Sequence, residues 1–457
     1  MVEGFVKEGR NSVIFECKGK NFLYEKIFNT FHSGSLEDLE RLHTKVERVD
    51  ISPRYKSDKN FVKHKLNNLE QLVLSVTEEC NFRCGYCIYS GRYEGRRTHS
   101  SNSMDFYVAK KAIDEYAKNC QRPPVISFYG GEPLLEAGLI ERVVEYAKEK
   151  FDGKVRFSVT TNGSLLSEVS DFLIRNNFVV YISLDGPPSI HNKYRRFKDG
   201  RESFTDILEN LKIIMEKDPD YYKRNVCFNV TISDPPKIKE IQEFFSQRLF
   251  RDNVCNVSFL ERKFLKKDFP EYSRENVQTG RKLLLDLLDA YTDSILNSEK
   301  SDMFLYGLFN HLVSSIRVEK VSRHPDTLWP GGCCVPGTKK LFTSVEGVFY
   351  PCEKCEGKLP LGDIRKGIER EKILAYLETF SKIKEDLCQN CWASRICNSC
   401  IVHAVDKDGT MSRESLQESC RSLKEGIYLR FRMHVTSLLS KNLSNYQSFL
   451  ENILTST

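Results

Sequence analysis

The sequence lacks the features of a membrane protein or an exported one. No unbroken apolar run in its 457 residues is long enough to cross a bilayer. Its first residues, MVEGFVKEGRNSVIFECKGK, contain no basic head followed by an apolar stretch and a small-residue cleavage site. We therefore expect a cytoplasmic protein that does not act on membranes.

The sequence also lacks a strong charge of one sign. Its 69 Lys and Arg residues are interleaved with 63 Asp and Glu residues, which leaves a formal net charge of only +6. Because nucleic-acid-binding proteins concentrate basic residues on one surface, nucleic acid is not an expected partner. No internal repeat or low-complexity tract is visible. The length favours two or three domains.

Cysteine, in contrast, is abundant, with 16 residues. In a reducing compartment, cysteines are more often metal ligands or catalytic thiols than disulfide partners. Their positions along the chain therefore carry most of the functional information.

Between residues 70 and 260, short apolar runs alternate with amphipathic stretches, a pattern typical of βα units. Six strands are predicted, at residues 72–77, 125–129, 155–160, 179–184, 226–232 and 254–260. The expected fold class is α/β, a partial (β/α)6 barrel of the TIM type. The first four strands run into the motifs TEECNFRCGYC, GGEP, TTNG and SLDGPPSIH. Because the C-terminal ends of parallel barrel strands lie on one face, these motifs should converge on one cavity.

The predicted domain organisation has four parts. Residues 1–66 contain a predicted hairpin and a short helix, and form a small N-terminal α+β element. The barrel occupies residues 67–300, a cysteine-rich extension occupies 301–424, and a C-terminal helix occupies 425–457.

Three cysteines follow the first strand with the spacing C-x3-C-x2-C, at Cys80, Cys84 and Cys87. Three thiolates on so short a loop can hold three irons of a [4Fe-4S] cluster and leave the fourth iron open to a ligand. For such a triplet taken alone, a zinc site or three unrelated buried cysteines are the alternatives.

This loop, with Tyr86 before its last cysteine, resembles the signature of the radical S-adenosylmethionine (SAM) enzymes. The GGEP motif is similar to that family's methionyl-binding turn. The resemblance implies that the open iron binds SAM, whose cleavage gives a 5′-deoxyadenosyl radical that takes a hydrogen atom from the substrate. The SAM-contacting residues that it implies are Tyr86, Gly130, Gly131, Glu132, Pro133, Asn162, Ser183, Asp185 and Arg195. Taken alone, TTNG and SLDG are also ordinary turn sequences.

A second group of cysteines lies between residues 333 and 420. It begins with a predicted hairpin, with Glu346 and Gly347 at its turn, and continues to a C-x2-C-x5-C-x2-C set. On spacing alone a zinc ribbon is an alternative. Attached to such a barrel, the segment resembles the SPASM extension, which implies two auxiliary [4Fe-4S] clusters. The resemblance assigns the nearer cluster to Cys334, Cys352 and Cys400, and the farther one to Cys388, Cys391, Cys397 and Cys420.

The segment departs from the SPASM pattern in two respects. The last spacing of the run is x2 where x3 is usual, and two additional cysteines, Cys333 and Cys355, flank the expected ligands. Either could complete the shell of the nearer cluster, or the shell could stay open for a substrate thiolate. We favour Cys355, because the adjacent Cys333 and Cys334 cannot easily both point at one cluster.

Within the SPASM group, the sequence resembles maturases of ribosomally made, cysteine-rich peptides, of the sactipeptide and ranthipeptide type, which form thioether cross-links from cysteine sulfur to carbon. The resemblance implies two partners: a cysteine-containing precursor peptide with a leader, and an electron donor such as flavodoxin or ferredoxin. Residues 1–66 could bind the leader by strand addition to a sheet edge, or could merely cap the barrel.

The main alternative is an anaerobic sulfatase-maturating enzyme, which oxidises a cysteine or serine to formylglycine. That family uses a carboxylate next to the cysteine after the hairpin as a base, and Glu353 stands in that place here. A non-catalytic zinc-binding protein is a remote alternative.

Overall fold

The computed structural model describes residues 3–440, apart from positions 52, 121–122, 264, 267–272, 301, 316–322 and 331–333. Within these ranges, no helix is long and apolar enough to span a bilayer.

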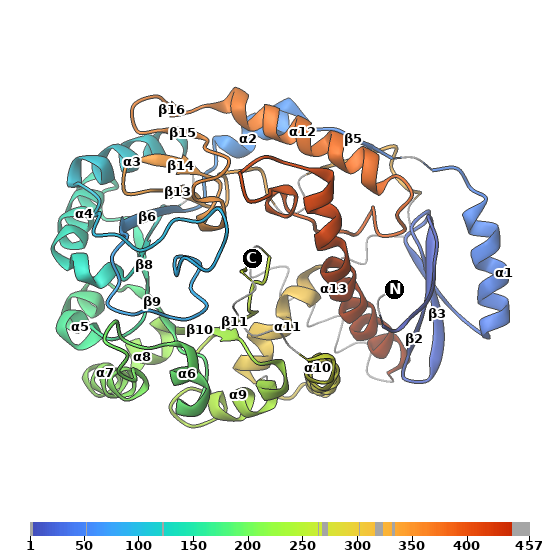
Figure 1. The fold of residues 1–457 in the computed structure, drawn as a ribbon, viewed down its shortest axis with the longest axis horizontal. Helices are drawn as coiled ribbons and strands as arrows, with labels where there is room; N and C mark the ends of the chain where they lie inside the picture. The colour runs from blue at the N-terminus through green and yellow to red at the C-terminus, as the bar shows by residue number, and fades with distance from the viewer. Residues whose placement is uncertain are drawn as a thin grey trace.

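Six parallel strands form the barrel sheet, in the order β11–β10–β9–β8–β7–β6 (Figure 1). Their bounds are β6 Leu72–Thr77, β7 Val125–Gly130, β8 Arg156–Thr161, β9 Val179–Ser183, β10 Val226–Ile232 and β11 Cys255–Phe259. Each strand begins and ends within one residue of its predicted limits. The predicted α/β fold with a partial (β/α)6 barrel is therefore confirmed.

Amphipathic helices cover the outer face of this sheet (Figure 1). The main ones are α3 Phe106–Asn119, α4 Ala137–Lys150, α5 Leu166–Arg175, α7 Phe204–Lys217 and α9 Ile238–Phe245, with the shorter α6 Pro188–Tyr194 and α8 Pro219–Asn225 between them. In α3, for example, Ala109, Ile113 and Tyr116 are buried, at the i, i+4 and i+7 spacing of one helix face. The apolar core between helices and sheet fixes the strand ends that carry the predicted motifs.

The cysteine-rich segment continues the barrel sheet. Strand β13 Leu341–Thr343 pairs in parallel with β6, and β14 Val348–Tyr350, β15 Gly362–Asp363 and β16 Gly367–Ile368 follow in antiparallel order. The predicted hairpin is thus β13–β14, and Gly347 adopts a left-handed φ of 87° at its turn. Backbone hydrogen bonds therefore attach the extension directly to β6, the strand that leads into Cys80.

Four longer helices complete the C-terminal half: α10 Arg274–Leu296, α11 Met303–Ser315, α12 Arg370–Cys388 and α13 Arg413–Leu439. Helix α13 runs without interruption through Cys420. The boundary predicted at residues 424–425 therefore falls inside one helix. Residues 441–457 of the predicted C-terminal helix lie outside the described residues.

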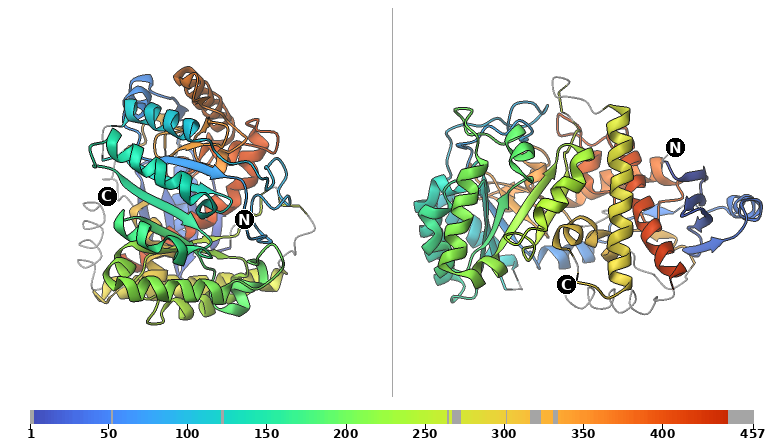
Figure 2. Two further views of the ribbon diagram at one scale, coloured as in Figure 1. Left: turned by 90° about the vertical axis from the view of Figure 1, so that its left-hand side faces the viewer. Right: turned by 90° about the horizontal axis from the view of Figure 1, so that it is seen from below.

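The N-terminal residues form a four-stranded antiparallel sheet and one helix. The elements are β1 Phe5–Glu8, β2 Ser12–Cys17, β3 Lys20–Glu25, β4 Thr30–Ser33 and α1 Leu36–Glu47, and the predicted hairpin is β2–β3. One face of the sheet packs against Trp392 and α13, with Phe15 and Tyr24 in ring contact with Phe431. Figures 1 and 2 show this sheet beside α13, away from the barrel.

A short connection leads from this sheet to the barrel. It contains β5 Arg54–Tyr55, which pairs with β12 Thr327–Leu328, and the helix α2 Lys59–Leu66.

Candidate functional site

The first three candidate ligands, Cys80, Cys84 and Cys87, lie together on the loop after β6, where, in addition to burial, Cys84 and Cys87 raise the pKa of Cys80 and Cys87 raises that of Cys84. Burial raises the pKa of Cys80 to about 12 and that of Cys84 to about 11. Burial disfavours a bare thiolate, and a bound metal cation removes this cost because it takes up the negative charge. A buried group of three thiols therefore fits a metal cluster better than a reactive free thiol.

Three of the predicted SAM-contacting residues form one buried group. The Tyr86 hydroxyl donates to the Asp185 carboxylate, and Nη1 of Arg195 donates to the Tyr86 oxygen at 3.0 Å. Burial raises the pKa of Asp185, and the Arg195 cation opposes this rise. Within the described residues, Nε of Arg195 is buried and has no hydrogen-bond partner. Loops after β6 and β9 thus bring a spare cationic donor beside the cysteines.

The GGEP and TTNG motifs are joined through Glu132. Its fully buried carboxylate accepts hydrogen bonds from the Thr161 hydroxyl at 2.7 Å, from the backbone N–H of Asn162 at 2.6 Å and from the backbone N–H of Leu134 at 3.0 Å. Pro133 is buried at the start of the short 3-10 helix Pro133–Glu136. The structure therefore gives the Glu132 side chain a role in fixing two motif turns to each other.

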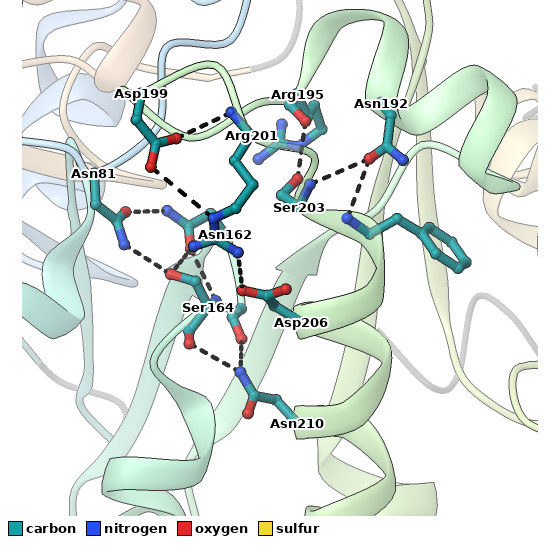
Figure 3. A network of polar contacts seen from close by, with 12 residues as sticks. Asn81, Asn162, Ser164, Asn192, Arg195, Asp199, Arg201, Ser203, Asp206 and Asn210 are labelled. Atoms are coloured by element: carbon teal, nitrogen blue, oxygen red, sulfur yellow. Dashed lines mark hydrogen bonds and ion pairs between the residues drawn. The ribbon is translucent and has the colours of Figure 1, made fainter.

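The side chain of Asn162 reaches the cysteine loop. Its Nδ2 lies 3.9 Å from Sγ of Cys80. It donates to Oδ1 of Asn81 at 2.8 Å (Figure 3). Its Oδ1 accepts from the Ser164 hydroxyl at 2.7 Å, and the carbonyl of Ser164 is in turn held by Nδ2 of Asn210 at 2.9 Å. This network anchors the loop of Cys80 to α7 through the TTNG turn.

The two glycines of GGEP allow the chain to approach β6 closely. A Cβ atom on Gly131 would collide with the backbone oxygens of Glu79 and Glu78, next to Cys80, whereas a Cβ atom on Gly138 in α4 would meet nothing. We expect Gly131→Ala to lower the free energy of unfolding by about 1–3 kcal/mol and to reduce iron loading, because backbone has to move to make room. Gly138→Ala should leave both unchanged. Thermal denaturation and iron content would measure this, and an unaffected Gly131→Ala would show that the close approach is not required.

The inner face of the barrel encloses a cavity of about 400 Å³. Side chains from β6 to β11 line it, among them Tyr129, Ser183 and Asn229, and the extension contributes Lys340 and Glu353. Nζ of Lys340 donates to Oε1 of Glu353 at 2.8 Å, whereas Oε2 of Glu353 is buried with no hydrogen-bond partner in the described chain. The carboxylate predicted as a base therefore lies in the wall of the barrel cavity.

Three candidate ligands of the nearer cluster lie together: Cys352, Cys355 and Cys400. The hydrogen bond from the Cys355 thiol lowers the pKa of Cys352 and raises that of Cys355, and Cys400 adds to the rise at Cys355. The one-turn helix Glu353–Cys355 brings Cys355 next to Cys352, whereas Cys400 comes from a separate segment ahead of the short helix Ile401–Ala404. Cys334 is half-buried ahead of β13, and Cys333 lies outside the described residues.

The four candidate ligands of the farther cluster also lie together. Burial raises the pKa of Cys388 to about 12, and the charges of the other three, Cys391, Cys397 and Cys420, act in the same direction. Cations from three parts of the chain surround them: Lys26, Lys384, Lys424 and Arg430. Four thiolates around one metal group carry excess negative charge, and these cations would offset it.

In the described residues, no three or more His, Cys, Asp or Glu side chains are arranged to hold a single metal ion. A four-iron cluster has a different requirement, because each thiolate binds its own iron at a separate corner. The three groups of cysteines fit such clusters in their donor type, their burial and their number.

Several functional candidates were not predicted. Two of them are lysines: Lys340 donates to Glu353, and Nζ of Lys26 donates to the carbonyl of Cys391 at 3.2 Å. No sequence motif indicates either contact, because the fold alone brings these lysines to their partners. Arg97 belongs to the loop sequence GRYEGRR, whose cluster of arginines directly after the C-x3-C-x2-C motif was the one available hint.

Comparison with known proteins agrees with this architecture. A family model described as the radical SAM superfamily matches residues 74–245. A cysteine-type anaerobic sulfatase-maturating enzyme of Clostridium perfringens is 26% identical over 368 residues, which cover 78% of this chain and 95% of that enzyme. An uncharacterized protein of Methanocaldococcus jannaschii is 30% identical over 301 residues, covering 65% of this chain and 90% of that protein.

Two further similarities extend over most of the chain. The radical SAM cyclopropyl synthase TigE of Paramaledivibacter caminithermalis is 22% identical over 410 residues, 85% of this chain and 76% of that enzyme. Among solved structures, native anSMEcpe with bound AdoMet has a TM-score of 0.59 at 20% identity, covering 79% of this chain and 98% of that chain. At this identity the structural match shows a shared fold.

Proposed function

Because this chain belongs to the radical SAM superfamily, we propose that it uses a SAM-cleaving [4Fe-4S] cluster to modify a cysteine-containing peptide by forming thioether cross-links. Cys80, Cys84 and Cys87 would hold that cluster. Cys334, Cys352 and Cys400 would hold the nearer auxiliary cluster, with Cys355 as the favoured addition, and Cys388, Cys391, Cys397 and Cys420 the farther one. When bound, SAM and these clusters supply a radical that abstracts hydrogen and an acceptor for one electron.

The position of Glu353 carries the proposal that a substrate thiol reacts in the barrel cavity. Its buried Oε2 has no hydrogen-bond partner in the described chain, and it lies in the wall of the cavity that the SAM-contacting strands enclose. It also follows Cys352 directly in the sequence. A substrate thiol that enters this cavity would therefore find a proton acceptor in its wall.

Thioether formation replaces one S–H bond and one C–H bond by one C–S bond, so the peptide loses two hydrogens per bridge. The carbon-bound hydrogen leaves as an atom, the thiol hydrogen leaves as a proton, and one electron remains to be accepted. Glu353 is the residue proposed to take the proton. Lys340, paired with Oε1 at 2.8 Å, orients the carboxylate and keeps Oε2 available.

The grouping of Cys355 with Cys352 and Cys400 supports a thioether product. With Cys334 as a fourth ligand the shell of this cluster would be complete, whereas without it the three grouped thiols would leave one iron for the thiolate of a substrate. A cysteine-containing precursor peptide with a leader and an electron donor of the flavodoxin or ferredoxin type are the proposed partners.

Formylglycine formation is the second candidate. It is supported by the similarity to the Clostridium perfringens sulfatase-maturating enzyme over 95% of that enzyme, and by a carboxylate at Glu353. In that reaction the substrate cysteine would lose its sulfur and gain a carbonyl, so the two products differ in mass and in sulfur content.

Anaerobic co-expression with a cysteine-rich peptide encoded beside this gene would test the proposal. We expect the intact peptide to lose two hydrogens per bridge and one alkylatable thiol per bridge, also after phosphine treatment, which opens disulfides but not thioethers. A peptide with each cysteine changed to serine is the matched control and should stay unmodified. An unchanged cysteine peptide, together with a sulfatase peptide that gains a carbonyl in place of sulfur, would overturn the thioether reading in favour of formylglycine.

A further inference from the structure

A buried polar group connects the first cysteine loop with the nearer auxiliary cysteines. It consists of Tyr89, two residues after Cys87, of Glu356, one residue after Cys355, and of Arg97. The Tyr89 hydroxyl donates to Oε2 of Glu356 at 2.5 Å, and Nε of Arg97 donates to Oε1 of Glu356 at 2.9 Å. The guanidinium of Arg97 also stacks on the Tyr89 ring, 3.6 Å from its centre.

Arg97 contacts the start of the first cysteine loop as well. Its Nε lies 3.3 Å from Oε1 of Glu78, two residues before Cys80, and Oε2 of Glu78 is held by the Ser100 hydroxyl at 2.6 Å. The backbone amide of Tyr89 lies 3.4 Å from Sγ of Cys87. Arg97 is therefore fixed from both sides, by a carboxylate beside each of two cysteine groups.

The remaining donors of this arginine are unused. Nη1 and Nη2 of Arg97 are buried, and neither has a hydrogen-bond partner in the described part of the chain. The guanidinium thus holds its positive charge and two spare N–H groups against the ring of Tyr89, whose backbone amide contacts Sγ of Cys87.

Such a cation has a defined effect on a cluster. Reduction adds one negative charge, so a nearby cation stabilises the reduced form and a nearby carboxylate stabilises the oxidised form. Charge and hydrogen bonds near the sulfurs are among the features that set cluster potentials.

We propose that Arg97 is a positioning residue that raises the reduction potential of the cluster at Cys80, Cys84 and Cys87, and that Glu356 and Tyr89 hold it there. The inference rests on the cluster assignment of the proposed function but not on the identity of the peptide product. Because Glu356 adjoins Cys355, the same contact fixes the position of the nearer auxiliary group relative to the SAM-cleaving site.

Redox titration of the reconstituted full-length enzyme, followed by electron paramagnetic resonance without any peptide, tests this inference. The signal that changes when SAM is added identifies the SAM-binding cluster. We expect Arg97→Gln to shift its potential to more negative values and Arg97→Lys to restore most of the shift. Glu356→Gln, which keeps the size of the side chain but removes its negative charge, should shift the potential in the opposite direction.

Arg251→Gln is the matched control, because Arg251 is 58% exposed in its side chain and pairs only loosely with Asp252, 4.0 Å away. It should leave the potential unchanged. If Arg97→Gln lost iron, the sign of the Glu356→Gln shift would still decide. A Glu356→Gln potential that matches the wild-type value would overturn the inference, as would equal shifts for Arg97→Gln and Arg97→Lys.

The test also separates two kinds of failure. A wild-type enzyme without a SAM-responsive signal would contradict the cluster assignment itself. A SAM-responsive signal with no shift in the variants would contradict only the role of Arg97.

Discussion

Cys80→Ala is expected to reduce SAM cleavage to the level of an enzyme-free control. With Cys80 removed, only two thiols of the loop remain, and three irons cannot each receive a protein ligand. Anaerobic incubation with dithionite and SAM, followed by chromatography of 5′-deoxyadenosine, measures this directly.

Cys120→Ser provides the control for this substitution. Cys120 is half-buried at the end of α3, on the outside of the barrel, and belongs to none of the three cysteine groups. The variant should cleave SAM at the wild-type rate. Substantial cleavage by Cys80→Ala, with a normal iron content, would show that the SAM-binding cluster is held elsewhere.

Glu353→Gln is expected to lower the rate of peptide modification by about 10²- to 10⁴-fold, the usual contribution of a general base, while SAM cleavage continues. The amide keeps the shape of the side chain and can still contact Lys340, but it cannot accept the thiol proton. The ratio of 5′-deoxyadenosine formed to peptide bridged should therefore rise steeply.

Glu346 offers a matched comparison, because it is an exposed glutamate at the turn of the same β13–β14 hairpin. Glu346→Gln should leave both rates unchanged. If Glu353→Gln bridged the peptide as fast as the wild-type enzyme, the proton would have to leave by another route, and Glu353 would be structural.

The sequence predicted the barrel well because its determinants are local. Each strand is a short apolar run that ends in a glycine or polar motif, and parallel strands must bring their C-terminal ends together. The positions of Tyr86, Asp185 and Arg195 in one buried group follow from that rule. Cys352 and Cys355 are near in sequence, so their contact also lay within reach of sequence reasoning.

Other parts of the site depend on long-range packing and have no local signal. Arg97 and Glu356 are separated by 259 positions, and the pairing of β13 with β6 helps to bring their segments together. The role of Glu132 could not be predicted either, because the GGEP sequence does not indicate that this carboxylate accepts hydrogen bonds from Thr161 and Asn162. The boundary placed before residue 425 falls inside α13, because this helix continues without a break from Arg413 to Leu439.

The contact of the N-terminal sheet with the farther cysteine group affects how shortened forms of this protein can be interpreted. Lys26, fully buried at the end of β3, donates to the carbonyls of Gln389 and Cys391, and Glu8 on β1 binds the ring nitrogen of Trp392 at 2.9 Å. Deleting the sheet to test whether it recognises a leader would also remove these contacts with the segment that carries the farther cysteine group. Inactivity of such a truncated enzyme would report lost cluster integrity as readily as lost peptide recognition, so point substitutions along the free edge of β4 are the cleaner probe.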